Sequence, residues 1–131
     1  MTAPQLRPPE RSRPLVAVVC AVPLLGEAME PALEFAEVRT FSGRSGDIGG
    51  LLQWLRPDAV VVDDDRNADG AALYAGEADI PVVHICARKH VLRLFHRGGW
   101  KVVSNGDGAT SEIIRNLVAG ALFAREGSAM T

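Results

Sequence analysis

The 131-residue chain has little of what marks membrane, metal-bound or nucleic-acid-binding proteins. No apolar run approaches the roughly 18 residues of a membrane span, and the N-terminus has no signal-peptide hydrophobic region. We therefore expect no contact with the membrane and a cytoplasmic location. The net charge is only −2, which argues against general affinity for nucleic acid or anionic lipid.

The sequence is equally short of catalytic signatures. It contains no P-loop, no GxGxxG pattern and no recognisable Ser-His-Asp or Cys-His pair. Its two cysteines, Cys20 and Cys86, lie in apolar strand-like runs, where buried reduced thiols are the usual interpretation. Two cysteines offer too few ligands for a metal site. We expect a protein that is not an enzyme and has no metal or cofactor.

One stretch organises the rest of the chain. Residues 58–65 read DAVVVDDD, four apolar residues that end in three carboxylates. A run this short and this apolar is typical of a parallel strand that is covered on both faces. Asp63, Asp64 and Asp65 then follow the strand at its carboxyl end, where open α/β sheets place their sites.

Other apolar runs alternate with helix-like segments on both sides of this strand. Besides 59–62, strands are expected over 15–21, 37–41, 80–87 and 100–103. Helices are expected from 23, with a kink or an early end at Pro31, and over 47–55, 67–77, 88–97 and from 110 onward. The pattern predicts an α/β fold, a flavodoxin-like, doubly wound, five-stranded parallel sheet in the order 2-1-3-4-5. Residues 1–13 are expected to form a disordered Pro/Arg-rich arm, 14–125 the folded domain and 126–131 a frayed tail.

Four segments in this order carry a family resemblance. They are VVCAVPLLGEA (18–28), LRPDAVVVD (55–63), IPVVHICA (80–87) and VLRLFHRGGWKVV (91–103). Over residues 14–125 the chain resembles the CheY-like receiver domains of two-component response regulators. The resemblance implies that Asp63 occupies the position of the phosphoacceptor aspartate.

The other active-site positions of a receiver carry different residues here. Cys20 and Ala21 stand where the resembling family has the acidic pair that holds Mg²⁺, which prefers oxygen ligands. Cys86 replaces the hydroxyl residue of the fourth strand, and Ser104 or Asn105 replaces the lysine of the fifth. The chain therefore looks like a degenerate pseudo-receiver, of the type found in LuxR-like regulators. Asp63, Asp64 and Asp65 are interpreted as an idle acidic cluster, an unusual phosphorylation or metal site, or, for Asp65, a helix cap.

A basic face is the main candidate for binding a partner. The expected helix 88–97 and the strand after it carry the five basic residues of this face. They are Arg88, Lys89, Arg93, Arg97 and Lys101. They form either a solvated helix surface or an interaction face, since the fourth helix, fifth strand and fifth helix form the signalling surface of the resembling family. His84, His90 and His96 are expected to be structural or solvated.

The sequence thus predicts a regulatory module that works without phosphorylation and binds either a protein partner or a second copy of itself. Two alternatives remain open. One is a sensor with a small ligand in the vacated phosphorylation pocket, and the other is a divergent regulator that is still phosphorylated.

Overall fold

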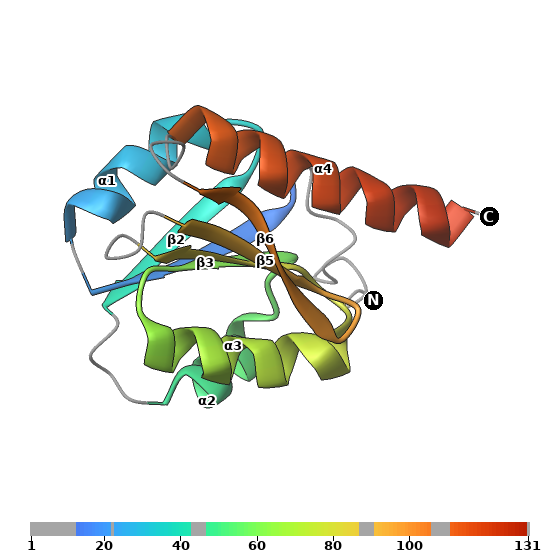
Figure 1. The fold of residues 1–131 in the computed structure, drawn as a ribbon, viewed down its shortest axis with the longest axis horizontal. Helices are drawn as coiled ribbons and strands as arrows, with labels where there is room; N and C mark the ends of the chain where they lie inside the picture. The colour runs from blue at the N-terminus through green and yellow to red at the C-terminus, as the bar shows by residue number, and fades with distance from the viewer. Residues whose placement is uncertain (1–12, 22, 43–46, 87–90, 106–110, 131) are drawn as a thin grey trace, which may run out of the picture.

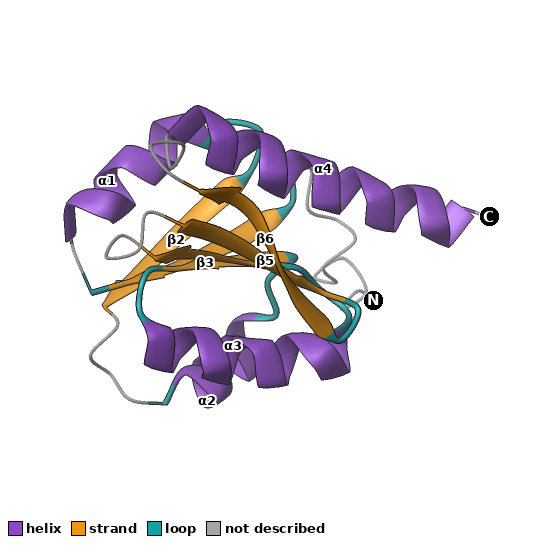
Figure 2. Ribbon diagram, in the orientation of Figure 1, coloured by secondary structure: helices purple, strands orange, loops and turns teal. Residues whose placement is uncertain are grey.

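The structure is a computed structural model, and it describes residues 13–21, 23–42, 47–86, 91–105 and 111–130. One mixed β-sheet forms the middle layer, with α1 (Pro23–Ala32) and α4 (Ser111–Met130) on one face. Helices α2 (Ile48–Leu55) and α3 (Asp65–Ala78) cover the other face (Figures 1 and 2). No helix in these ranges is long and apolar enough to cross a membrane.

In the described part of the chain, six strands form the sheet in the order β2-β1-β3-β4-β5-β6. The first four along the chain pair in parallel, whereas β5 is antiparallel to both of its neighbours. The strands are β1 (Leu15–Cys20), β2 (Glu37–Ser42), β3 (Ala59–Val62), β4 (Val82–Cys86), β5 (Val91–His96) and β6 (Gly99–Asn105). The α/β class is confirmed, but the five-stranded all-parallel sheet is wrong, because an additional antiparallel strand, β5, lies between β4 and β6 in the described residues.

Alternating side chains of the continuous apolar strands supply two separate cores. Val18 and Val61 face α1 and α4, while Val60 and Val62 face α2 and α3. All four residues of β3 are at most 1% exposed, as expected of a central strand covered on both faces. The carboxyl ends of β1, β3 and β4 therefore meet at one edge of the sheet, and the Asp63–Asp65 segment leaves from it.

The largest departure from expectation lies at residues 91–105. The expected helix 88–97 is wrong where the structure describes it, because Val91–His96 is a strand and forms a hairpin with β6. The hairpin turns at Arg97 and Gly98, whose φ values of 55° and 87° suit a two-residue turn of the primed type. A glycine at position 98 suits the end of a helix as well as this turn, so the residue type alone does not distinguish the two.

Other expected features of the helices fare better. Helix α1 ends at Ala32, directly after Pro31, in agreement with the expected early end. Asp47 caps α2, with its side chain accepting a hydrogen bond from Gly50 N at 2.9 Å.

Helix α3 begins at Asp65 with Asp64 as its N-cap residue, so the suggested capping role of Asp65 is wrong. Helix α4 runs to Met130, through residues that were expected to be frayed, and the arm before Arg13 lies outside the described residues.

Candidate functional site

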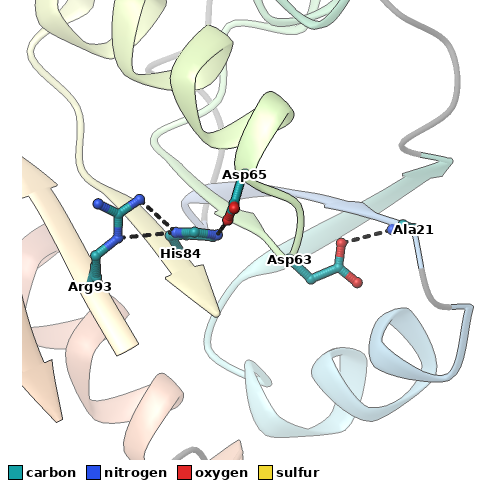
Figure 3. Close-up of polar contacts among 5 residues, drawn as sticks. All are labelled: Ala21, Asp63, Asp65, His84 and Arg93. Atoms are coloured by element: carbon teal, nitrogen blue, oxygen red, sulfur yellow. Dashed lines mark hydrogen bonds and ion pairs between the residues drawn. The ribbon is translucent and has the colours of Figure 1, made fainter. Parts of the chain in front are cut away.

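The carboxyl end of β3 is tied to the end of β1 by a carboxylate. Asp63 follows β3 directly, and its Oδ1 accepts a hydrogen bond from the backbone N–H of Ala21 at 2.8 Å (Figure 3). Ala21 follows β1, which is the parallel neighbour of β3. The hydrogen bond thus joins the two strands at the point where the strand order reverses, the usual ligand position in open α/β sheets.

Cys20 does not line this edge. Its side chain is 5% exposed and packs in the core beneath α1 and α4, with its Sγ 3.9 Å from Phe41 O. Cys86 lies on β4, at the same alternate positions as Val82, which faces α2 and α3. The two cysteines are therefore on opposite faces of the sheet as well as on different strands, and no disulfide joins them.

His84 lies at the centre of a second set of polar residues. It is on β4, directly opposite Arg93 of the antiparallel β5, and it is only 1% exposed. Arg93 approaches the ring nitrogen Nδ1 of His84 with both Nε, at 3.1 Å, and Nη2, at 2.8 Å (Figure 3). An arginine can only donate hydrogen bonds, so Nδ1 must be the acceptor and the proton of the neutral ring is on Nε2.

Trp100 fixes the position of the guanidinium from the other side. The Cζ of Arg93 lies 4.3 Å from the centroid of the Trp100 ring, within the range of a cation–π contact. The same ring meets Phe95 and His84 edge to face, with centroids 5.3 and 6.0 Å apart. The hairpin thus forms a fixed surface of two aromatic side chains and one arginine beside the buried histidine.

The electrostatic surroundings keep His84 neutral. Burial is the largest cause that lowers its pKa, and the charge of Arg93 lowers it further. The carboxylates of Asp65, Asp64 and Asp63 act in the opposite direction but do not outweigh these two effects.

Asp65 and Cys86 complete the group around His84. Asp65 Oδ1 lies 3.2 Å from His84 Nε2, and Cys86 is two residues beyond His84 on the same side of β4. One ligand atom from each of these three residues lies within 4.8 Å of the others. Since Asp65 is the first residue of α3 and Val62 pairs with His84, the short β3–α3 connection places the carboxylate here.

Only some of the expected site residues come together. Asp63, Asp65 and Cys86 gather near the carboxyl ends of β3 and β4, while Cys20 faces the opposite core. Ser104 and Asn105 belong to β6, which is two strands away from β4 in the sheet, so they do not occupy a strand beside β4.

The basic helix face is also corrected. Arg93 is half-buried against His84 and Trp100 and is not a solvent-facing helix residue. Arg97 is in the hairpin turn and Lys101 is exposed on β6, whereas Arg88 and Lys89 lie outside the described residues.

No family model matches the chain, and neither the curated proteins nor the solved structures contain a significant match to it. The site must therefore be interpreted from its own geometry.

Sequence reasoning missed the pairing of His84 with Arg93. The two are cross-strand neighbours only because 91–96 is an antiparallel strand, whereas the sequence pattern predicts a helix for that segment. The signal that was available is the two-residue spacer Arg97-Gly98 between two apolar runs, which favours a hairpin.

Proposed function

We propose that this protein is a non-enzymatic regulatory module that binds a protein partner and works without phosphorylation of Asp63. The observation that carries the proposal is the composition of the sheet edge around that carboxylate. One oxygen of Asp63 accepts the N–H of Ala21, whose side chain is only a methyl group, and the preceding residue, Cys20, turns its side chain into the core.

Phosphoryl transfer to Asp63 needs metal ligands and hydrogen-bond donors that Cys20 and Ala21 do not supply. A transferred phosphoryl group is stabilised by a metal ion and by donors that neutralise its oxygens. Neither Cys20 nor Ala21 has the side-chain oxygen that Mg²⁺ prefers, and a thiol such as that of Cys86 is a weak hydrogen-bond donor. Losing one such group costs about 10²–10³ in rate, so losing several leaves no useful reaction.

The buried histidine does not support catalysis either. A general base needs a free lone pair within reach of a substrate proton. The Nδ1 lone pair of His84 is engaged by Arg93, and its Nε2 carries the proton. The pair is better suited to holding β4 and β5 in register than to moving a proton.

The β5–β6 hairpin is the surface that favours binding of a partner protein. Strand β6 is an edge strand of the described sheet, and an edge strand can accept an added strand from another chain. Val102 is 56% exposed at the centre of this strand, beside the exposed Lys101. A partner that adds an extended segment here would cover Val102 and gain backbone hydrogen bonds.

The test is quantitative capture of partners from extracts of the source cell with matched variants. Val102→Glu should abolish capture, because it puts a charge into the proposed contact without touching the core. Leu73→Glu is the control, since Leu73 is 77% exposed on α3 and not on the hairpin. Asp63→Asn should leave capture unchanged.

Two results would contradict the proposal. Loss of capture in Asp63→Asn alone would show that partner binding depends on the carboxylate of Asp63, and would favour a function that requires its phosphorylation. Equal loss in Val102→Glu and Leu73→Glu would show that β6 is not the contact. Light scattering of the pure protein shows whether a second copy is the partner.

A further inference from the structure

We propose that Asp65, His84 and Cys86 form a binding site for a zinc-type divalent transition-metal ion, with His84 Nε2 as the nitrogen ligand. The inference does not depend on the proposed function. It rests on three observations about the residues at the carboxyl ends of β3 and β4: the donor atoms, their spacing and the state of the buried imidazole.

The donor set matches the chemistry of zinc. Carboxylate oxygen, imidazole nitrogen and cysteine sulfur are the three ligand types that Zn²⁺ takes from proteins. The hard ions Mg²⁺ and Ca²⁺ prefer oxygen alone, so a set with nitrogen and sulfur selects against them. Three protein ligands would leave a fourth tetrahedral position for water.

The spacing is close to what one ion requires. Metal–ligand bonds of about 2.0–2.3 Å at tetrahedral angles place neighbouring ligand atoms about 3.3–3.6 Å apart. The oxygen of Asp65 is already 3.2 Å from His84 Nε2, and all three ligand atoms lie within 4.8 Å of one another. The Asp65 side chain is 80% exposed and therefore free to rotate toward the ion.

The imidazole is the observation that points to a ligand. His84 Nε2 is buried from solvent and makes no hydrogen bond within the described part of the chain. Asp65 Oδ1 is near enough to be a partner, but the pair does not have hydrogen-bond geometry. Buried polar nitrogens are rarely left in this state, because each one costs desolvation free energy that nothing offsets. An ion between the three residues would satisfy it.

Access and charge are also suitable. The Asp65 side chain is 80% exposed and Cys86 is partly exposed, so an ion can enter from solvent while the ring stays buried. One carboxylate and one thiolate neutralise the two positive charges of the ion. Binding removes the Cys86 thiol proton and the Nε2 proton, which leave to solvent unless Nδ1 takes up the latter.

Arg93 works against the ion and gives the proposal its sharpest test. A metal-bound histidine normally donates its other N–H to an acceptor, whereas here Nδ1 faces two donors from Arg93. Arg93 must move, or the ring must bind as an imidazolate, so the wild-type affinity is lowered. Arg93→Gln supplies a carbonyl oxygen that can accept from Nδ1 and should tighten binding by about tenfold or more.

The experiment is titration of the full chain with Zn²⁺ against a chromophoric chelator, and with Co²⁺ as a spectroscopic probe. We expect one ion per chain with a Kd below about 0.1 mM, and a thiolate-to-cobalt absorption band. Cys86→Ser should remove the band and weaken binding by at least about 100-fold, and Asp65→Asn should weaken it by about tenfold. Asp64→Asn is the matched control, because this neighbouring carboxylate makes no side-chain cap bond and lies outside the set.

Several results would overturn the site. These are the absence of binding below about 0.1 mM, binding that survives Cys86→Ser in a variant with an unchanged far-UV spectrum, or equal weakening by Asp64→Asn and Asp65→Asn. Weaker binding by a folded Arg93→Gln variant would remove Nε2 as the ligand atom.

Discussion

Two glycines of α3 give a matched test of how the helix that carries Asp65 is packed. Gly70 and Gly76 both lie within the helix, where replacing glycine by alanine stabilises by about 0.5–1 kcal/mol. Their surroundings differ. A Cβ at Gly76 would meet only Phe95 Cζ at 4.0 Å, whereas a Cβ at Gly70 would overlap Cγ2 of Ile48 on α2.

The two substitutions should therefore have opposite signs. Ile48 is 7% exposed and its Cγ2 cannot turn away without moving the whole β-branched side chain. Overpacking of this kind costs about 1–3 kcal/mol, which outweighs the gain in helix propensity. Gly76→Ala should raise the melting temperature by about 2–4 °C, and Gly70→Ala should lower it by up to about 10 °C, at about 4 °C per kcal/mol for a domain of this size.

The assay is thermal and urea unfolding followed by circular dichroism. Repeating the Gly70 substitution in an Ile48→Ala variant tests the cause directly, because this variant lacks the methyl group that the new Cβ would overlap. There Gly70→Ala should stabilise by about 0.5–1 kcal/mol, so the double-mutant cycle shows a coupling energy equal to the relieved overlap. If Gly70→Ala stabilised the wild-type protein as much as Gly76→Ala does, the described contact between α2 and α3 would be refuted.

Three further predictions concern the rest of the fold. Gly98→Ala should cost about 1–2 kcal/mol because φ is 87° there, whereas Gly99→Ala should be nearly neutral, and equal effects in urea unfolding would argue against the hairpin turn. Asp58 Oδ2 accepts the N–H of Leu15 at 2.8 Å, so Asp58→Ala should destabilise the protein by about 1–3 kcal/mol in chemical unfolding. Asp58→Asn keeps an acceptor and should cost less. An equal cost for the two variants would argue against this hydrogen bond. In the metal-free protein, stability should fall as pH drops below the ordinary histidine pKa of about 6.5, by at most about 1.4 kcal/mol per pH unit, because the unfolded chain protonates before the buried His84 does. An NMR titration that placed the pKa of His84 above 6.5 would reverse this sign.

The parallel half of the fold could be predicted from sequence because its signals are local and agree with one another. Short runs such as Ala59–Val62 are too apolar for anything but a covered strand, and Asp47 and Pro31 mark helix ends by their own chemistry. The order of β2, β1, β3 and β4 then follows from the usual rules of α/β connection.

The antiparallel half could not be predicted in the same way. Residues 91–96 place apolar side chains at positions that suit either period, since Val91, Leu94 and Phe95 also share a helix face. Only pairing with β4 decides between the two, and pairing is a long-range property. The resemblance to receiver domains favoured the helix and so reinforced the error.

The candidate site shows the same division. The position of Asp63 at the end of β3 could be predicted, because it depends on one strand and its direction. The contacts of His84 could not, because Arg93 and Asp65 reach it from two other elements. When 91–96 is predicted to be a helix, Arg93 is not placed opposite His84. The sequence then indicates no partner for this histidine, and the structural or solvated interpretation follows.

The central claim is that Asp63 does not accept a phosphoryl group. The most direct test is a measurement of the mass of the intact protein. The full chain is incubated with a small acyl-phosphate donor and Mg²⁺ and then weighed by mass spectrometry. No added mass is predicted, because Cys20 and Ala21 supply no metal-binding oxygen beside Asp63 and the thiol of Cys86 is only a weak hydrogen-bond donor. A stable gain of about 80 Da, the mass of one phosphoryl group, that is absent in Asp63→Asn would contradict the account and establish Asp63 as a working phosphoacceptor.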